Sequence, residues 1–540
     1  MVLADIAVAP RPSQVRPAEE QYPSEPPPEV HRHPVQSWQH RLQFLSRQPW
    51  PLAGILALQT GLSLRLVWSN TAFNDEALYL WSGHWVIAHL LYATKIPRFQ
   101  TYFSGAPLIY PVIGAIADSY GGLALARVLS LAFMLGTTVL CYLTGKRLFG
   151  PQAGLIGAAL FAVLGPVQFL GALATYDPMA LFCLALSSWL VVRSAGQVGG
   201  ALGLIPAALV LAIGDAAKYA TILWNPVVIA LAGLAVGGDW RSAWPRAARM
   251  AGYTAAFLAV LLRIAGASYV QGLLVTTLSR PTSTAPAMAV FRDSALWIGI
   301  LVLIAARSIV IAEGRRTRIL AAVLAGAALL APLEQARIHT TTALQKHVAF
   351  GAFFAAIAAG WVLAHAVQRS KYSRWRIVFG TLVALTVMGT LQGGWLAEGW
   401  PDSAPVLAAM KRAIAAAPGP VLSEQGVVVN YYLRLPPTRL TNTFAFTYQP
   451  PDGGPALTGI PAYLAALRNH YFTVVEIDGA YNRHLGVDRA VTAQVESEAG
   501  YRLVFKQPWS DHTGSGVYRV WQYQPDASAS PRSGGPGGRG

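Results

Sequence analysis

Asn74-Asp75-Glu76-Ala77-Leu78-Tyr79-Leu80-Trp81-Ser82 directly follows the first long apolar segment of the chain. Adjacent carboxylates at the mouth of a membrane helix are costly to place, and such residues usually serve a function. Asp75 and Glu76 are therefore the first candidates for catalysis, at one face of a membrane. Taken alone, the pair is equally compatible with a solvated loop or with a helix N-cap, for which Asn74 and Asp75 are both suitable.

Long apolar segments recur along the whole chain. Of its 540 residues 54% are hydrophobic and only 12% are charged, against about 25% charged in soluble domains. Because a spanning helix needs about 20 apolar residues, we expect an α-helical polytopic membrane protein with roughly eleven transmembrane helices. The expected spans are 50–69, 122–144, 152–173, 177–195, 201–215, 219–237, 250–269, 295–312, 319–333, 347–366 and 377–396.

The positive charges follow an alternating pattern. The formal net charge of +16 could indicate nucleic-acid binding, but the basic residues lie in short loops between apolar segments. Every second loop is basic, which is the pattern of the positive-inside rule, with contacts to anionic lipids as a further consequence. We therefore expect a multi-pass protein of a bacterial inner (plasma) membrane, with a cytosolic N-terminus, an extracytoplasmic C-terminal domain and no nucleic-acid partner. The basic loop residues are Lys146, Arg147, Arg193, Arg241, Arg246, Arg249, Arg315, Arg316, Arg318, Arg369, Lys371, Arg374 and Arg376.

The chain divides into four parts by composition. Residues 1–48 are polar and Pro-rich and are predicted to be a disordered cytosolic arm, and residues 49–396 form the membrane domain. Its first outer loop, 70–121, is long and aromatic, with helical spacing over 76–92, which indicates an amphipathic helix in the interface plane. An ordinary aromatic belt is compatible with the same residues. Residues 526–540 are of low complexity and are predicted to be a disordered tail.

Residues 397–525 differ in kind from the membrane domain. The runs at 420–422, 472–477 and 501–505 have the composition of strands, and 461–470 has that of a helix. Gly- and Pro-rich turns separate them. We expect a small extracytoplasmic α/β domain of about 130 residues, a size that can fold alone.

Two further polar groups lie on the same expected face as Asp75. Asp177 begins the fourth span, where it could equally be an N-cap followed by Pro178. Lys218 and Tyr219 lie between the fifth and sixth spans, where Lys218 could simply pair with Asp215. Acidic groups from separate segments that meet at one face either shift a carboxyl pKa or bind a cation. Both outcomes suit general-base or metal-assisted chemistry.

A cationic loop precedes the tenth span. It contains Arg337, His339, Lys346 and His347. These side chains could be interfacial anchors that extend to lipid headgroups, or they could clamp a phosphate or pyrophosphate. Arg127 lies within an apolar span, where an arginine is expected to face protein or phosphate rather than lipid.

The motifs together resemble a known family. Asn-Asp-Glu-Ala-x-Tyr-x-Trp-Ser is similar to the Asp-Glu-Ala-Tyr-Tyr-type motif of bacterial GT-C membrane glycosyltransferases, which include the aminoarabinose transferase of lipid A and the protein O-mannosyltransferases (dolichyl-phosphate-mannose-protein mannosyltransferase-like). Other matching stretches, in the same order and with the same sidedness, are Leu125-Ala126-Arg127-Val128, Tyr176-Asp177-Pro178-Met179-Ala180-Leu181-Phe182, Ala217-Lys218-Tyr219 and Gln345-Lys346-His347.

The resemblance implies an inverting transfer of a sugar from a polyprenyl-phosphate donor to a hydroxyl of a lipid, glycan or protein acceptor. We expect Asp75 to be the base, with Glu76 and Asp177 shaping its field. Cations stabilise the negative charge of the leaving lipid phosphate, and Lys218, Arg337 and Lys346 are the candidates for this role. The whole expected phosphate-binding set is Lys218, Tyr219, Arg337, Lys346, His347 and Arg127.

Two alternatives remain at the level of sequence. No cofactor is required, but a divalent metal held by Asp75, Asp177 and His339 is possible, although no ligand spacing demands one. The main rival function is a membrane transporter or flippase for a lipid-linked or anionic substrate. Transporters place charges near the bilayer midplane and often contain repeats, whereas these charges cluster at the outer ends of helices.

Overall fold

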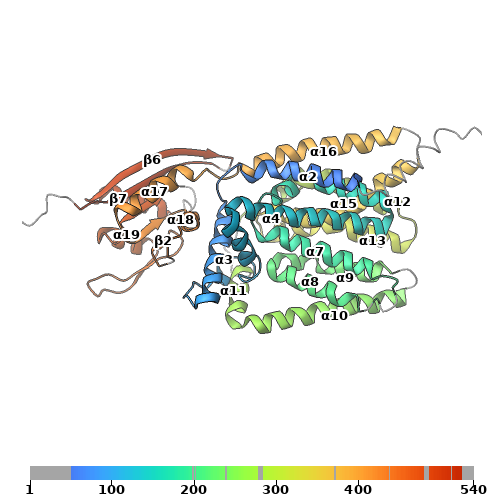
Figure 1. Cartoon of the computed structure of the whole chain (residues 1–540), viewed down its shortest axis with the longest axis horizontal. Helices are drawn as coiled ribbons and strands as arrows, with labels where there is room; N and C mark the ends of the chain where they lie inside the picture. The colour runs from blue at the N-terminus through green and yellow to red at the C-terminus, as the bar shows by residue number, and fades with distance from the viewer. Residues whose placement is uncertain are drawn as a thin grey trace, which may run out of the picture. The chain divides into compact units, whose positions relative to one another are not determined.

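The computed structural model describes residues 50–197, 200, 202–236, 240–277, 284–369, 373–436, 438–479, 486–512 and 514–525 (Figure 1). The expected arm, 1–48, and tail, 526–540, lie outside the described residues. Most helices run side by side as a bundle, and among the described residues the short 3-10 turns η2 and η3 interrupt it. The helices that follow the first outer loop or precede it are α2 (Trp50–Val67), α4 (Tyr110–Phe149), α5 (Pro151–Ala162), α6 (Gly165–Leu170), α7 (Tyr176–Arg193), α8 (Leu204–Ala217), η2 (Tyr219–Trp224), α9 (Asn225–Leu234), α10 (Trp240–Ala265), α11 (Ala267–Thr277), α12 (Ala287–Ile311), α13 (Arg315–Gly326), η3 (Ala327–Leu329), α14 (Leu330–Arg337), α15 (Leu344–Gln368) and α16 (Ser373–Ala397).

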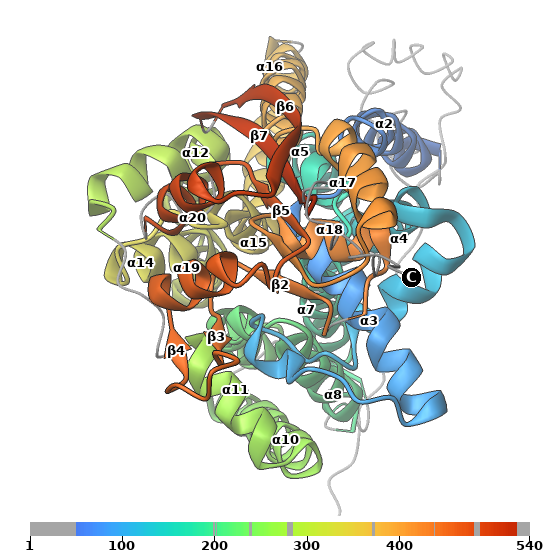
Figure 2. The same ribbon diagram turned by 90° about the vertical axis from the view of Figure 1, so that its left-hand side faces the viewer.

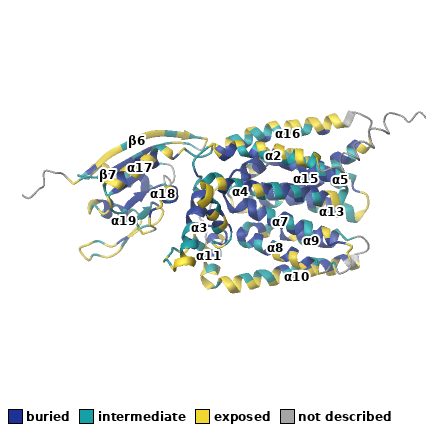
Figure 3. Cartoon of the chain, in the orientation of Figure 1, coloured by how far each residue is buried: buried dark blue, intermediate teal, exposed yellow. Residues whose placement is uncertain are grey.

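Helix α15 is the centre of the bundle. In its most apolar stretch 83% of the residues are buried, against 22% in α2 and α16 and 11% in α10. Figure 3 shows the same gradient, with dark blue on α15 and yellow along α16 and α10. An apolar helix that remains exposed to this degree needs an apolar solvent. The outer helices thus present their apolar faces to lipid, and the chain is a multi-pass α-helical membrane protein.

Seven helices among the described residues are long and apolar enough to cross a membrane, so the number eleven stays a prediction. The expected span 152–173 divides into α5 and α6, because Pro166 in the first turn of α6 has no N–H to continue a helix. The expected span 219–237 begins with the 3-10 turn η2, and Pro226 opens α9 in the same way. These shorter apolar helices do not meet the length needed for a full crossing.

Helix α3 (Asn74–Tyr92) lies across the ends of the bundle helices instead of running along them (Figure 1). Its bounds confirm the helix expected in the first outer loop, and its orientation agrees with a position in the interface plane. The chain then passes through η1 (Phe99–Thr101) and enters α4. Helix α4 changes direction at Gly121 and Gly122, which have non-helical angles, with a φ of +63° at Gly122 that favours glycine.

The C-terminal domain is a three-layer α/β structure, which confirms the expected fold class. Its five-stranded sheet has the order β2-β1-β5-β7-β6, with parallel pairing of β1 to β2 and β5 and antiparallel pairing of β7 to β5 and β6. A second sheet pairs β3 with β4. The elements are α17 (Ala404–Ala416), β1 (Val421–Ser423), α18 (Gly426–Leu433), β2 (Leu440–Asn442), β3 (Thr447–Tyr448), β4 (Leu457–Thr458), α19 (Ile460–Arg468), β5 (Val474–Ile477), α20 (Val487–Ser497), β6 (Tyr501–Asp511) and β7 (Gly514–Tyr523).

Alternate residues of the central strands face the two helical layers. Val421 and Val474 pack with α17 and α18, whereas Leu422 and Val475 pack with α19 and α20. Figure 2 shows these two pairs of helices on opposite sides of the sheet. The alternation is the period of two that a strand imposes, so short apolar runs can build both halves of the domain core.

Candidate functional site

Asp75 and Lys346 meet at one end of the bundle. Asp75 lies in the first turn of α3 and Lys346 in the first turn of α15, and the distance from Lys346 Nζ to Asp75 Oδ2 is 2.5 Å. A helix N-terminus stabilises a carboxylate but not an ammonium group, so Lys346 depends on Asp75 for compensation. The lysine side chain is 4% exposed and the aspartate side chain 32%, which leaves Asp75 accessible.

A second carboxylate and lysine form a deeper pair. Asp177, in the first turn of α7, accepts a hydrogen bond from Lys218 Nζ at 2.5 Å and another from the Thr175 hydroxyl at 3.0 Å. Its side chain has no solvent exposure. Lys218 does not pair with Asp215, the alternative considered from the sequence, because Asp215 instead accepts a hydrogen bond from Asn225 at 2.7 Å.

The two pairs form one cluster of four charges. Lys346 interacts electrostatically with Asp177 as well as with Asp75, and Lys218 interacts with Asp75 as well as with Asp177. The Lys218 ammonium group lies 4.8 Å from the ring centre of Tyr176, a distance typical of a cation–π contact. We name Asp75, Asp177, Lys218 and Lys346 the four-charge cluster. Its members come from four segments that are far apart in the sequence.

Glu76 and Arg127 have a different arrangement, although Glu76 is the neighbour of Asp75. Arg127 forms a bidentate ion pair with Glu76, with N···O distances of 2.8 and 2.7 Å, and both side chains are buried. Its remaining N–H groups donate to the carbonyl groups of Val67, Asn70 and Thr71. All five donors of the guanidinium group are thereby used within the protein. This arrangement gives Arg127 a structural role and leaves it no N–H group for the expected phosphate.

Glu76 also fixes two backbone segments. Its carboxylate accepts the Phe73 N–H at 2.9 Å and the Ala174 N–H at 2.7 Å. The first bond caps α3, and the second joins α3 to the chain just before Asp177. Glu76 thus sets the distance between the two carboxylates of the cluster without being exposed to a substrate.

The segment that carries Lys218 is fixed by the first outer loop. The Ala106 N–H donates to Ala216 O at 2.8 Å, and the Tyr219 N–H donates to Ser104 O at 3.1 Å. Between them lies Gly105, where a Cβ atom would be 2.3 Å from Ala217 O. Only glycine permits this close approach.

The other predicted residues lie further out or pack differently. Arg337 is 70% exposed and pairs with Glu334 on the same helix. Tyr219 packs edge-on against Tyr269, with 5.9 Å between ring centres. His347 interacts electrostatically with Asp177, so it lies beside the cluster, as expected for the residue after Lys346. The backbone carbonyl of His339 accepts a hydrogen bond from the Ala285 N–H. This bond joins the segment before α12 to the segment between α14 and α15.

The expected metal site is not assembled. Within the part of the chain that the structure describes, no group of three or more His, Cys, Asp or Glu side chains is placed to hold a metal ion. Asp75 and Asp177 each contact a lysine instead. The donor set does not fit a metal ion.

Sequence reasoning missed a polar cluster between the membrane domain and the C-terminal domain. Asp118 of α4 accepts a hydrogen bond from the Tyr431 hydroxyl at 2.5 Å, and its other oxygen lies 2.6 Å from His84 Nε2. Beside it, the Ala72 N–H donates to the Tyr432 hydroxyl oxygen at 2.8 Å. An acid inside an apolar stretch, as Asp118 is, was the signal that could have identified it.

Comparison with solved structures identifies the fold. The chain is similar to ArnT from Cupriavidus metallidurans bound to undecaprenyl phosphate, with a TM-score of 0.59 and 11% identity over 87% of this chain and 98% of that one. It is also similar to the arabinofuranosyltransferase AftD from Mycobacteria (TM-score 0.54, 15% identity, 87% of this chain and 40% of that one). A third similar structure is the apo Archaeoglobus fulgidus oligosaccharyltransferase (TM-score 0.50, 13% identity, 87% and 74%).

These similarities confirm the GT-C fold that the sequence motifs predicted. At such low identity they establish the fold and leave the activity to be argued from the site. No protein-family profile and no curated protein sequence matches the chain.

Proposed function

We propose that this protein is an inverting glycosyltransferase that moves a sugar from a polyprenyl-phosphate donor to an acceptor hydroxyl at the extracytoplasmic face of a bacterial inner membrane. The observation that carries the proposal is the four-charge cluster, in which two carboxylates and two lysines from distant segments meet at one end of the bundle. Buried charges of this kind are expensive in a membrane protein and are a mark of a functional site.

Asp75 is the proposed base. Inversion at the anomeric carbon requires a base on the acceptor hydroxyl, opposite the leaving phosphate. Asp75 is partly exposed, whereas Asp177 has no exposure and is held by Lys218 and Thr175. An acceptor can therefore approach Asp75 directly, while Asp177 organises the cluster from behind it.

The lysines are proposed to bind the donor phosphate. A phosphodiester carries a negative charge that Lys346 can pair with in place of Asp75. The exchange would release Asp75 from its ion pair, so that its carboxylate can contact the acceptor hydroxyl when the donor is present. Asp75 then takes the acceptor proton, the acceptor oxygen bonds to the anomeric carbon, and the bond from that carbon to the phosphate oxygen breaks. The lipid phosphate leaves with the electron pair, and Lys218 and Lys346 stabilise its charge.

Two further observations support a donor that is linked to a polyprenyl lipid. The chain is predicted from its sequence to place the cluster at the outer ends of the helices, and the first structural neighbour was solved with undecaprenyl phosphate bound. A donor embedded in the bilayer through a polyprenyl tail reaches such a site laterally. The same donor needs no Gly-rich nucleotide loop, and the sequence has no such motif after a strand.

The experiment measures transfer of labelled sugar from a panel of polyprenyl-phosphate sugars in membranes, with acceptors supplied from cell extracts. Wild type, Asp75→Asn and a matched control, Glu496→Gln on the exposed face of α20, are compared at equal amounts of inserted protein. We expect one donor to be consumed by wild type and Glu496→Gln but not by Asp75→Asn. Consumption of no donor, together with movement of a lipid-linked substrate across the membrane, would instead establish the transporter alternative.

A further inference from the structure

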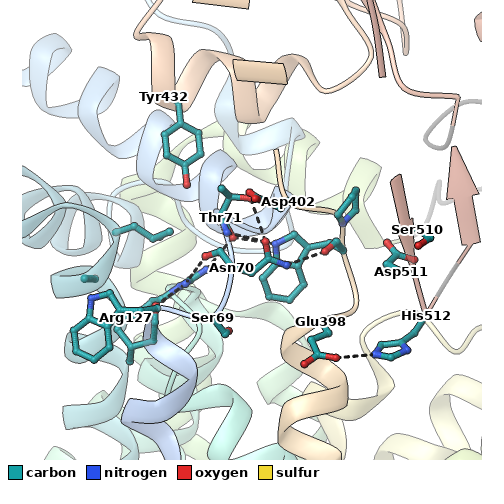
Figure 4. Close-up of a pocket in the computed structure, with 16 residues that line it drawn as sticks. Ser69, Asn70, Thr71, Arg127, Glu398, Asp402, Tyr432, Ser510, Asp511 and His512 are labelled. Atoms are coloured by element: carbon teal, nitrogen blue, oxygen red, sulfur yellow. Dashed lines mark hydrogen bonds and ion pairs between the residues drawn. The ribbon is translucent and has the colours of Figure 1, made fainter. Parts of the chain in front are cut away.

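A cavity of about 840 Å³ lies beside the loop that leads into α3. Its walls come from residues 67–71, the part of α4 after the Gly121–Gly122 bend, the linker 398–402, Tyr432 and the turn between β6 and β7 (Figure 4). Among the described residues that line it, none belongs to the four-charge cluster. Its volume is in the range of small-molecule sites, which is about 300–1,000 Å³. The cavity is therefore a second place where a ligand of several rings can fit.

The charge of the cavity is negative. Three carboxylates line it, those of Glu398, Asp402 and Asp511, and His512 lies 3.4 Å from Glu398. Figure 4 shows Glu398 and His512 facing each other at one side of the cavity and Asp402 at another. The guanidinium group of Arg127 also reaches the wall, but Glu76 neutralises it and the protein uses all its donors. A phosphate or an anionic headgroup is repelled here, whereas hydroxyl and ammonium groups find acceptors.

Aromatic side chains provide the remaining contact surface. Trp68 is 69% exposed at the cavity wall, so its ring is available to a ligand. Trp400 and Tyr432 are fixed in place, because the Trp400 indole N–H donates to Thr71 O at 2.9 Å and the Tyr432 hydroxyl accepts the Ala72 N–H. Rigid aromatic rings next to hydrogen-bond acceptors suit a ligand that has both apolar C–H faces and many polar hydrogens.

We propose that this cavity is a saccharide-binding site that is separate from the four-charge cluster and selects neutral or amino-bearing sugars over phosphorylated ones. Sugar rings have C–H faces that pack on aromatic rings, and their hydroxyl or ammonium groups donate to the carboxylates. Binding at this site does not depend on the proposed transfer reaction. The loop 68–73 connects the two sites, because Asn70 donates to Trp400 O at 2.8 Å and Asp75 is the second residue of α3, which follows this loop.

The test is direct binding to the purified full-length protein in detergent, by calorimetry and tryptophan fluorescence. The probes are a neutral glucose tetrasaccharide, a glucosamine tetrasaccharide and glucose 1-phosphate. We expect saturable binding of both tetrasaccharides, tighter for the amino sugar, and none for the sugar phosphate. Asp402→Asn and Glu398→Gln should each weaken binding of the amino sugar about tenfold. Trp68→Ala should weaken both tetrasaccharides about tenfold.

The matched controls are Glu496→Gln for the carboxylates and Trp50→Ala for the exposed tryptophan, both away from the cavity, and both should bind as wild type does. Thermal unfolding of each variant verifies that it is folded. Asp75→Asn should retain saccharide binding, so that loss of transfer with intact binding counts against the proposed function alone. The cavity proposal is overturned by an absence of saturable saccharide binding, by binding that Asp402→Asn and Trp68→Ala leave unchanged, or by equal affinity for glucose 1-phosphate.

Discussion

Asp75 and Glu76 are neighbours in the sequence, but they differ in solvent exposure and in the groups that they contact. Glu76 is buried, accepts four hydrogen bonds and holds Arg127, whereas Asp75 is partly exposed and contacts Lys346. Successive residues of an α-helix point about 100° apart, so one helical turn directs the first carboxylate to the cluster and the second to the protein interior. A pair of acids in a motif can therefore combine one partly exposed group with one buried structural group.

The largest loss of stability should come from removing the partner of Glu76, the structural carboxylate of the two. Arg127→Met leaves Glu76 buried without a cation and three carbonyl groups without a donor, which should cost about 3–5 kcal/mol in the free energy of unfolding. We expect little folded protein in detergent, measured by monodisperse yield and thermal unfolding. Arg292→Met removes an exposed ion pair with Asp293 and should behave like wild type. A stable Arg127→Met protein would mean that this buried pair is not structural.

Asp75→Asn should affect activity far more than stability. The amide keeps the size of the side chain and Asp177 still interacts with Lys346, so the protein should lose less stability than Arg127→Met does. On the proposed function, transfer should fall by about 10²–10⁴-fold, the usual contribution of a general base. The rate of sugar transfer and the unfolding temperature are measured on the same preparation. An unfolding temperature that falls as far as in Arg127→Met would remove the distinction between the two carboxylates.

Substitution of the two lysines of the cluster should have different effects on stability, because their aspartate partners differ in burial. Lys218→Met leaves Asp177 with no exposure, whereas Lys346→Met leaves the partly exposed Asp75. Lys218→Met should therefore destabilise the protein by about 2–4 kcal/mol, and Lys346→Met by less. Adding Asp177→Asn to Lys218→Met should restore much of the stability, because no buried charge then remains. Equal losses for the two lysine variants in thermal unfolding would contradict this assignment.

A third type of buried carboxylate occurs in the C-terminal domain. Burial, together with the nearby charge of Glu424, raises the pKa of Glu476 to about 7, although a hydrogen bond from Ser423 opposes the shift. The folded protein thus keeps a proton that the unfolded chain releases near pH 4.5. The domain should lose up to about 3 kcal/mol of stability as the pH rises from about 4.5 to 7. Glu476→Gln should flatten this dependence in thermal unfolding curves; an unchanged slope would assign it to another group.

The sequence predicted the helical membrane class, the α/β domain and the residues of the cluster, because apolar length, strand composition and charge are local properties. It could not predict which lysine pairs with which aspartate. Lys218 has Asp215 three residues away, yet it bonds to Asp177, 41 residues away. The role of Glu76 depends likewise on backbone N–H groups, and that of Arg127 on backbone carbonyl groups, which only the folded chain presents. The sequence therefore could not show that Arg127 has no N–H group left for a phosphate. The helix breaks before Pro166 and Pro226 follow from a local property, because proline has no N–H group to continue a helix.

The hydrogen bond from Ala72 to Tyr432 joins residues 360 positions apart, and the ion pair of Asp75 with Lys346 joins residues 271 positions apart. The ribosome synthesises Asp75 long before Lys346 and Tyr432, so the nascent chain has an incomplete four-charge cluster until α15 has been made. The hydrogen bond between Ala72 and Tyr432 can form only later still. Assembly of the cluster is thus a late step in the synthesis of the membrane domain.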